Sequence, residues 1–410
     1  MHATSRTSPI KTRKTALCAS PGVQALRRNR QPKRRMTSRE PKPVGFAVAV
    51  VAPFPPPSGG MSVQAAKLAE RLTGEGIPVE TVAVNPVLPR WSRWAESVPG
   101  LRTALREAVF LRRMLAVLPK VSVVHHLSAS GLYFFLTTTP VTLLGRLWGR
   151  RVIVNYRGGL AESFLKRWGW LAVPILRMAH HVAVSSAFLQ RVFGRHGVEA
   201  SLLPNLADLE RFHYRERMPL RPRLIVTRNL EPMYNVECVL RAFRAIQQRY
   251  PEATLCVAGS GSEQARLQKL AGELNLSGLT FLGAVRHEDL PQLYDDHHIL
   301  VNASNVDNFP GSLLEAACCG LPVVTTAAGG IPDMIQDHQT GLLVGVNDHE
   351  ALAGAVLELL AQPELALRLA RAARRWVEQF CWERVYGSLL EHYGLPSVAA
   401  ANQERKRAWA

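Results

Sequence analysis

The chain has 410 residues, of which 47% are hydrophobic, and a formal net charge of +18. It is about twice as long as a usual single domain, so two packed domains are expected. No apolar stretch reaches the ~18 residues needed to cross a bilayer, because the nearest candidate, 131–144, is broken by three threonines and a proline. This excludes a membrane-spanning protein. The apolar patch after the basic N-terminus is too short for a secretory signal, so a cytoplasmic protein is expected.

The positive charge is concentrated in the first half of the chain. Residues 1–42 carry a net charge of +11, residues 43–199 another +11, and residues 200–410 a net charge of −4. An anionic partner surface is therefore expected near the first half. Residues 1–42 have almost no apolar periodicity and are predicted to be a disordered basic tail, with Met36 as an alternative start.

From residue 43 onward, short apolar runs alternate with amphipathic stretches. Residues 44–51 form an apolar run typical of a strand buried on both faces, and a Pro/Gly loop and a helical pattern at 63–72 follow it. Further strands are predicted at 79–84, 121–124, 151–155 and 181–184. This alternation predicts a Rossmann-like domain with a parallel sheet over residues 43–205.

A second set of strands follows a polar, proline-bounded linker at about 204–222. These strands are predicted at 223–227, 253–258, 279–282, 299–302 and 322–325. Two tandem doubly wound domains fit this pattern better than one large sheet, so residues 206–375 are predicted to form a second Rossmann-like domain.

The last helical stretch, about 364–393, carries Trp376 and Trp382 at a spacing that suits one apolar face. Residues 376–395 are expected to be a helix that packs back on the first domain, and 396–410 to be a tail.

The segment 305–322 is the most informative part of the sequence. It predicts a loop followed by a short helix that begins near Gly311 and is closed by Gly320. The free N–H groups of Gly311 and Ser312 at the positive end of such a helix suit a diphosphate, and Glu315 is placed to accept hydrogen bonds from ribose hydroxyls. The alternative is structural, because Ser312 and Glu315 also have the spacing of a capping box.

A second glycine loop, 328–333, follows the next predicted strand. Both loops therefore end at the same edge of one sheet, which is the edge where open α/β sheets bind their ligands.

These segments resemble glycosyltransferase family 4, a retaining family with the two-domain GT-B architecture. The resemblance covers about residues 44–393. The motifs that carry it are, in order, 57–61, 182–186, 203–212, 257–261, 281–283, 307–322 and 329–332.

The resemblance implies an α/β fold in which two Rossmann-like doubly wound domains face each other across a cleft. The first domain would bind the acceptor and the second a nucleotide-sugar donor. Sugar transfer to an acceptor hydroxyl, with retention and without a metal or other cofactor, is expected. The acceptor is expected to be a saccharide or lipid-linked, as in polysaccharide or glycolipid synthesis. Further donor contacts are implied for Gly59, Gly60, Asn205, Gly259, Gly261, Asn308, Gly329 and Gly330.

Three positions depart from the family pattern. Asp307 occupies the position of the first of two paired glutamates, of which Glu315 is the second, so Asp307 and Asn308 are expected to influence which sugar is accepted. Arg228 matches a diphosphate-binding arginine, but Tyr234 stands where a lysine is usual and brings no charge.

Arg157 aligns with an active-site histidine. A permanent cation cannot act as a base but can hold a phosphate or the sugar. Arg157, Arg228, Asp307 and Glu315 are therefore the candidate catalytic residues. In retaining enzymes of this architecture the departing diphosphate accepts the acceptor's proton, so the protein mainly positions groups and stabilises charge.

Tryptophans and cations are interleaved in the first domain. Five of the eight tryptophans, at 91, 94, 148, 168 and 170, lie among arginines and lysines, which suits contact with an anionic membrane surface. The alternative is that the tryptophans are core residues and the cations form a solvated face.

Other functions remain open: a nucleotide-sugar epimerase or glycoside phosphorylase of the same architecture, an inactive donor-binding homologue, or a basic nucleic-acid-binding protein. No nucleic-acid motif is present, so no nucleic acid is expected as a partner.

The cluster 295–298 is interpreted as the end of a helix rather than a metal site, and the six cysteines lack metal-ligand spacing. His125 is expected to end a strand at the cleft edge and to line the acceptor site.

Overall fold

The computed structural model describes residues 45–55, 59–88 and 97–396. The chain divides into two units, Met1–Lys42 and Pro43–Ala410. The first unit, which was predicted to be a disordered tail, lies outside the described residues, and so does 397–410 of the predicted C-terminal tail.

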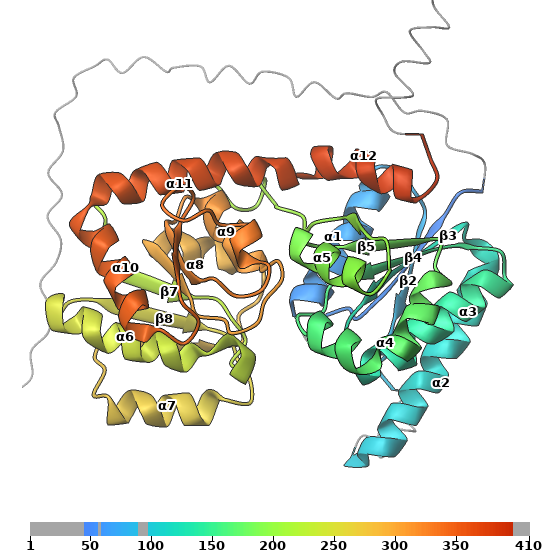
Figure 1. Ribbon diagram of the computed structural model, residues 1–410, viewed down its shortest axis with the longest axis horizontal. Helices are drawn as coiled ribbons and strands as arrows, with labels where there is room; N and C mark the ends of the chain where they lie inside the picture. The colour runs from blue at the N-terminus through green and yellow to red at the C-terminus, as the bar shows by residue number, and fades with distance from the viewer. Residues whose placement is uncertain (1–44, 56–58, 89–96, 397–410) are drawn as a thin grey trace, which may run out of the picture. The chain divides into compact units, whose positions relative to one another are not determined.

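The first sheet has six parallel strands in the spatial order β2-β1-β3-β4-β5-β6 (Figure 1). The strand order reverses between β1 and β3, which places a topological switch point at the carboxyl ends of these two strands. The strands are β1 Val48–Ala52, β2 Val79–Ala83, β3 Val123–Ser128, β4 Arg151–Tyr156, β5 His181–Val184 and β6 Ser201–Leu202. The helices are α1 Gly60–Gly74, α2 Pro99–Val117, α3 Thr139–Leu147, α4 Ala161–Arg177 and α5 Ala187–Arg195.

The second sheet also has six parallel strands, in the order β12-β11-β10-β7-β8-β9. Its switch point lies between β7 and β10. The strands are β7 Arg223–Val226, β8 Thr254–Ala258, β9 Leu279–Gly283, β10 Ile299–Asn302, β11 Val323–Thr326 and β12 Leu342–Val344. The helices are α6 Val236–Arg249, α7 Gln264–Glu273, α8 Leu290–Asp296, α9 Gly311–Cys319, α10 His349–Ala361 and α11 Pro363–Val377. The last helix, α12 Trp382–His392, packs on the first sheet.

Each sheet separates two hydrophobic cores. In β1, Val48, Val50 and Ala52 pack on the side of α1 and α12, whereas Ala49 and Val51 pack on the side of α2–α5. A strand buried on both faces needs apolar residues at every position, and this explains the uninterrupted apolar run in the sequence. The prediction of two Rossmann-like, doubly wound domains is confirmed.

The C-terminal helical stretch is two helices rather than one. The chain becomes extended at Cys381, between α11 and α12. Trp376 packs on Phe380, with ring centroids 4.8 Å apart, against a core of the second sheet, whereas Trp382 belongs to a core of the first. The expectation that both tryptophans share one apolar face is therefore wrong, because the break between them sends each to a different core.

None of the helices in the described ranges is both long enough and apolar enough to cross a bilayer.

Candidate active site

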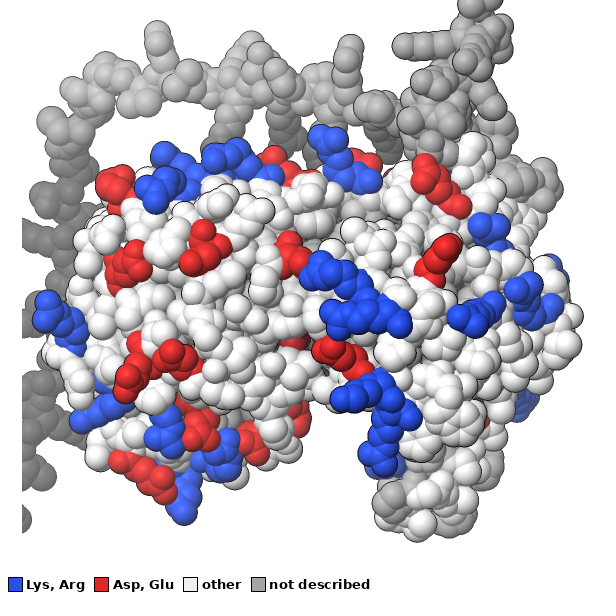
Figure 2. All heavy atoms as spheres, viewed as in Figure 1, with Lys and Arg blue, Asp and Glu red and all other residues white. Residues whose placement is uncertain are grey.

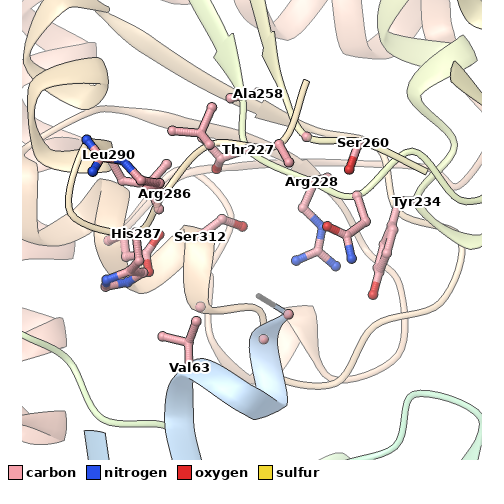
Figure 3. Close-up of a pocket in the computed structure, with 18 of the residues that line it drawn as sticks. Val63, Thr227, Arg228, Tyr234, Ala258, Ser260, Arg286, His287, Leu290 and Ser312 are labelled. Atoms are coloured by element: carbon pink, nitrogen blue, oxygen red, sulfur yellow. The ribbon is translucent and has the colours of Figure 1, made fainter. Parts of the chain in front are cut away.

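Loops at the two switch points meet around a cavity of about 420 Å³, here called the large cavity. The start of α1 borders it from the first domain, and the ends of β7 and β8 and the start of α9 border it from the second. Figure 3 shows Arg228 and Tyr234 on one side, Arg286 and His287 on the other, and Ser312 pointing into the space between them. The cavity thus lies where a doubly wound sheet is expected to bind a ligand.

A small chamber of about 220 Å³ adjoins the large cavity. The two spaces share five lining residues, which are Gly60, Asn205, Arg228, Tyr234 and Gly311. A ligand that occupies both would pass the start of α9.

The N-terminus of α9 presents unpaired polar groups to the large cavity. The helix begins at Gly311 after Pro310, which offers no side-chain cap. Within the described ranges, no hydrogen bond is made by the N–H groups of Gly311 and Ser312. The Ser312 side chain is only 6% exposed, and its Oγ has no partner. Because buried polar groups normally have partners, this helix end is suited to an anionic ligand.

The alternative capping box is not formed, because the helix already begins at Gly311 and the Glu315 carboxylate points elsewhere. The Tyr294 hydroxyl donates to Glu315 Oε2 at 2.9 Å, and His287 Nε2 lies 3.1 Å from Oε1. Arg211 donates to His287 Nδ1 at 2.9 Å, so Nε2 carries the hydrogen that His287 donates to Glu315. Glu315 is therefore held at the cavity wall as a hydrogen-bond acceptor.

Sequence reasoning did not find Tyr294 and His287. Burial raises the pKa of Tyr294 well above its ordinary value, so its phenol remains a donor at neutral pH. Both residues reach Glu315 from distant positions in the sequence, and no local motif marks them.

Arg228 forms an ion pair with Asp307. The Arg228 guanidinium also lies 4.0 Å from the centroid of the Tyr234 ring. Burial raises the pKa of Asp307, while Arg228 opposes this shift. The two departures at 234 and 307 thus act on one cation: Tyr234 covers its face and Asp307 neutralises it.

Polar side chains of the small chamber join the two domains. The Arg157 guanidinium donates to Asn205 Oδ1, and Asn205 Nδ2 donates to the Phe309 carbonyl at 2.6 Å. Asn308 donates from Nδ2 to the Gly158 carbonyl, whereas its Oδ1 has no partner although the side chain is only 3% exposed. The chamber therefore retains an unsatisfied acceptor that a ligand hydroxyl can fill.

The sequence is similar to those of known glycosyltransferases. Residues 215–376 match the family model described as "Glycosyl transferases group 1". A GDP-mannose-dependent alpha-(1-6)-phosphatidylinositol monomannoside mannosyltransferase of Mycobacterium tuberculosis is 27% identical over 378 residues, covering 82% of this chain and 95% of that protein. A D-inositol 3-phosphate glycosyltransferase of Saccharomonospora viridis is 34% identical over 205 residues, covering 45% of this chain and 48% of that protein.

Solved structures of other proteins share the fold. Sucrose-phosphate synthase from Thermosynechococcus elongatus superposes with a TM-score of 0.68 at 21% identity, covering 85% of this chain and 98% of that one. Anabaena Alr3699/HepE, in complex with UDP and glucose, gives a TM-score of 0.66 at 17% identity, covering 84% of this chain and 98% of that one. The chain is a glycosyltransferase with the GT-B fold. The narrower assignment to family 4 remains a prediction.

The predicted glycines of this glycosyltransferase fall into two groups. Besides Gly311, those that line the large cavity are Gly59, Gly60 and Gly259. Three others, Gly261, Gly329 and Gly330, line neither space. A Cβ on Gly329 would lie 2.1 Å from the Asp307 carbonyl oxygen, and one on Gly330 would lie 2.1 Å from that of Asn308. These two glycines allow the close approach of the loop that carries Asp307 instead of lining the cavity.

His125 does not line the acceptor side of the enzyme. It lies within β3 and is fully buried, with Nδ1 3.0 Å from the Tyr393 hydroxyl and Nε2 3.1 Å from Asn155 Nδ2. Burial lowers its pKa well below the ordinary value. The strand continues to Ser128, so Ala129 reaches the small chamber in its place. The expectation for His125 is therefore wrong.

Proposed function

We propose that this enzyme moves a sugar from a nucleoside diphosphate sugar to an acceptor hydroxyl, with the nucleotide in the large cavity and the sugar in the small chamber. The observation that supports this most strongly is the N-terminus of α9, where free amides and the unpartnered Ser312 hydroxyl face the large cavity. Glu315 lies one turn further on and would accept hydrogen bonds from the ribose. A diphosphate beside a helix N-terminus is a recurrent arrangement.

The reaction proposed is a substitution at the anomeric carbon. The bond between C1 and the phosphate oxygen breaks, and its electron pair stays on the departing diphosphate. The acceptor oxygen bonds to C1 from the same face, and its proton passes to the departing phosphate oxygen, so the configuration is retained as in family 4. Arg228 and the α9 amides would stabilise the charge on the leaving group, and no metal or other cofactor is assigned a role.

Asp307 and Asn308 are proposed to bind the donor sugar. Both line the small chamber, and Asn308 Oδ1 is an acceptor without a partner. The Asp307 carboxylate is already paired with Arg228 but retains lone pairs for a sugar hydroxyl. Two nucleotide sugars, GDP-mannose and UDP-glucose, are natural first choices as donors. The mycobacterial relative is named for GDP-mannose, and Alr3699/HepE has been solved with UDP-glucose.

We further propose that the enzyme acts at the inner face of the cell membrane, on a saccharide or lipid-linked acceptor. Three of the five tryptophans can be checked: Trp170 is 71% exposed, Trp148 40% and Trp168 38%, whereas Trp91 and Trp94 lie outside the described residues. The core alternative therefore does not account for these three.

The surrounding surface is apolar and basic. Leu147 on α3 is 76% exposed, and Lys166 and Arg167 are exposed on α4 beside Trp168 and Trp170. From Lys120 to Val198 the sequence has ten lysines and arginines and a single acid. Figure 2 shows mainly basic side chains on one face of the domain that holds the first sheet. Indole rings flanked by cations suit the interface of an anionic bilayer.

A donor screen followed by a turnover assay tests the proposed function. The full chain is mixed with UDP-glucose, UDP-N-acetylglucosamine, GDP-mannose and related donors, and unfolding is followed by thermal shift. A true donor raises the melting temperature in proportion to the logarithm of its concentration over its dissociation constant. The stabilising donor is then incubated with saccharide and lipid-linked acceptors, and diphosphate release and product anomeric configuration are measured.

The expected result is acceptor-dependent release of UDP or GDP with retained configuration. Conversion of the donor sugar without an acceptor would instead identify an epimerase, and donor binding without turnover would identify an inactive homologue. Salt-sensitive binding to random duplex DNA, without any effect of nucleotide sugars, would favour the nucleic-acid alternative.

A further inference from the structure

Arg157 is a cation without a counter-ion. It follows β4 and lines the small chamber, and the described residues include no carboxylate that pairs with it. Its guanidinium donates to the neutral Asn205, while its Nε is buried without a partner. Burial lowers the pKa of Arg157 to about 10, so the group remains charged at neutral pH. A desolvated charge without an ionic partner is costly and therefore suggests a missing anion.

The charge of the small chamber depends on this residue. Arg228 and Asp307, which form an ion pair, cancel each other, and Arg157 is the remaining charged side chain in the lining. At the far side of the large cavity, Arg286 is already paired with Glu288 and Asp289. A diphosphate between the α9 amides and the small chamber would therefore meet a net positive charge chiefly because of Arg157.

Asn205 fixes the position of Arg157 relative to α9. Its Oδ1 accepts from Arg157, and its Nδ2 donates to the carbonyl of Phe309, two residues before Gly311. The cation of the first domain is thus tied through one amide to the proposed diphosphate site of the second.

We propose that Arg157 is the second diphosphate-binding cation of this enzyme and that it reaches the donor from the opposite domain to Arg228. This inference rests on the proposed function. When the C1–O bond breaks, negative charge grows on the departing phosphate, and Arg157 stabilises that charge without giving up a proton. Leaving-group stabilisation then requires both domains, so a donor held by the second domain alone is poorly activated.

The test compares binding of a diphosphate with binding of its nucleoside in the full-length chain. UDP with uridine and GDP with guanosine are titrated calorimetrically into the wild type, Arg157→Gln and Arg157→Lys. Glutamine keeps an amide that can donate to Asn205 but removes the charge, whereas lysine keeps the charge. Arg112→Gln, at an exposed arginine on α2 of the same domain, is the matched control.

In Arg157→Gln, affinity for the diphosphate that the wild type binds should fall about 10- to 100-fold, with nucleoside affinity unchanged. Arg157→Lys should retain most of the diphosphate affinity, and Arg112→Gln all of it. Unchanged diphosphate affinity in Arg157→Gln would overturn the inference. So would a loss of nucleoside affinity in Arg157→Gln as large as the loss of diphosphate affinity. An equal loss of diphosphate affinity in Arg157→Gln and Arg157→Lys would also overturn it, because the charge would then not matter. The proposed function fails separately, if the wild type releases no diphosphate from any donor.

Discussion

The hydroxyl of Tyr294 donates a 2.9 Å hydrogen bond to the carboxylate of Glu315. Tyr294 lies on α8 and Glu315 on α9, so the contact ties two neighbouring helices at the wall of the large cavity. A carboxylate has about four lone-pair sites, and Tyr294 and His287 use two of them. The remaining sites are free to accept from a ligand hydroxyl.

Replacing Glu315 should weaken nucleotide binding through the ribose. Glu315→Gln removes a charged acceptor, so affinity for UDP or GDP should fall about 10-fold. Calorimetry with the 2′-deoxy and 3′-deoxy forms of the same nucleotide shows whether the loss comes from a ribose hydroxyl. The form that lacks the hydroxyl bound by Glu315 should bind the variant and the wild type almost equally. Glu273→Gln, at an exposed acid on α7, is the control. If every deoxy form loses affinity as the parent nucleotide does, Glu315 does not bind the ribose.

Breaking the pair between Arg228 and Asp307 should cost both stability and activity. Arg228→Gln leaves a buried carboxylate unpaired, so the free energy of unfolding at pH 7 should fall by about 3 kcal/mol. Burial already raises the pKa of Asp307, and loss of Arg228 raises it further. Protonation of Asp307 removes its unpaired buried charge. The difference in the free energy of unfolding between Arg228→Gln and the wild type, measured by urea denaturation, should therefore shrink as the pH falls towards 5.

The double variant Arg228→Gln with Asp307→Asn separates the two effects. It should recover most of the lost stability because no buried charge remains, yet stay at least about 100-fold below wild-type turnover because the leaving group lacks its cation and the donor sugar lacks the Asp307 carboxylate. Wild-type turnover in the double variant would contradict a role for Arg228 in the reaction.

Vesicle binding should depend on the exposed apolar and basic surface of α3 and α4. Trp170→Ala and Leu147→Ser should each reduce co-sedimentation with phosphatidylglycerol vesicles by about 10-fold, because each side chain buries apolar area in the bilayer interface. Binding should also weaken with added salt. Val346→Ser, at an exposed apolar residue of the second domain, should have no effect. Equal binding to neutral phosphatidylcholine vesicles, or no effect of either substitution, would contradict the membrane proposal.

The buried His126 should make the enzyme sensitive to acid. Its Nδ1 lies 3.0 Å from the Val51 carbonyl and its Nε2 3.0 Å from the Thr138 hydroxyl, which fits a neutral ring. Burial lowers the pKa of His126 to about 4. The unfolded chain, with a histidine pKa of about 6.5, binds the proton first as the pH falls.

His126 should therefore leave stability unaffected above pH 6.5 and reduce it by up to about 3 kcal/mol between pH 6.5 and 4. Denaturation across this range should give a smaller pH dependence for His126→Gln than for the wild type, whereas the exposed His213→Gln should follow the wild type. An unchanged pH dependence in His126→Gln would show that folding does not lower the pKa of His126.

The sequence was sufficient for the fold and for the start and end of α9, because both depend on local patterns. The apolar run of β1 predicts a strand buried on both faces, and the glycines around 311–320 predict the start and end of α9. The contacts that shape the site are not local. Glu315 meets Tyr294 and His287 from 21 and 28 residues away, and Arg228 meets Asp307 from 79 residues away.

The predictions that were wrong also concern features that local sequence patterns do not determine. His125 has the position of a strand-end residue in the sequence, but β3 runs three residues further and buries it. The two tryptophans 376 and 382 have a helical spacing, but the break at Cys381 sends them to different cores. Pattern alone did not distinguish cavity glycines from those that permit close backbone packing, because that depends on which loop approaches them.

A crystal structure of the enzyme with the nucleoside diphosphate that stabilises it most would show directly whether the N-terminus of α9 binds the diphosphate. Diphosphate oxygens should lie within hydrogen-bonding distance of the Gly311 and Ser312 amides, with a ribose hydroxyl on Glu315. A nucleotide bound elsewhere, with the N-terminus of α9 still unoccupied, would contradict this prediction.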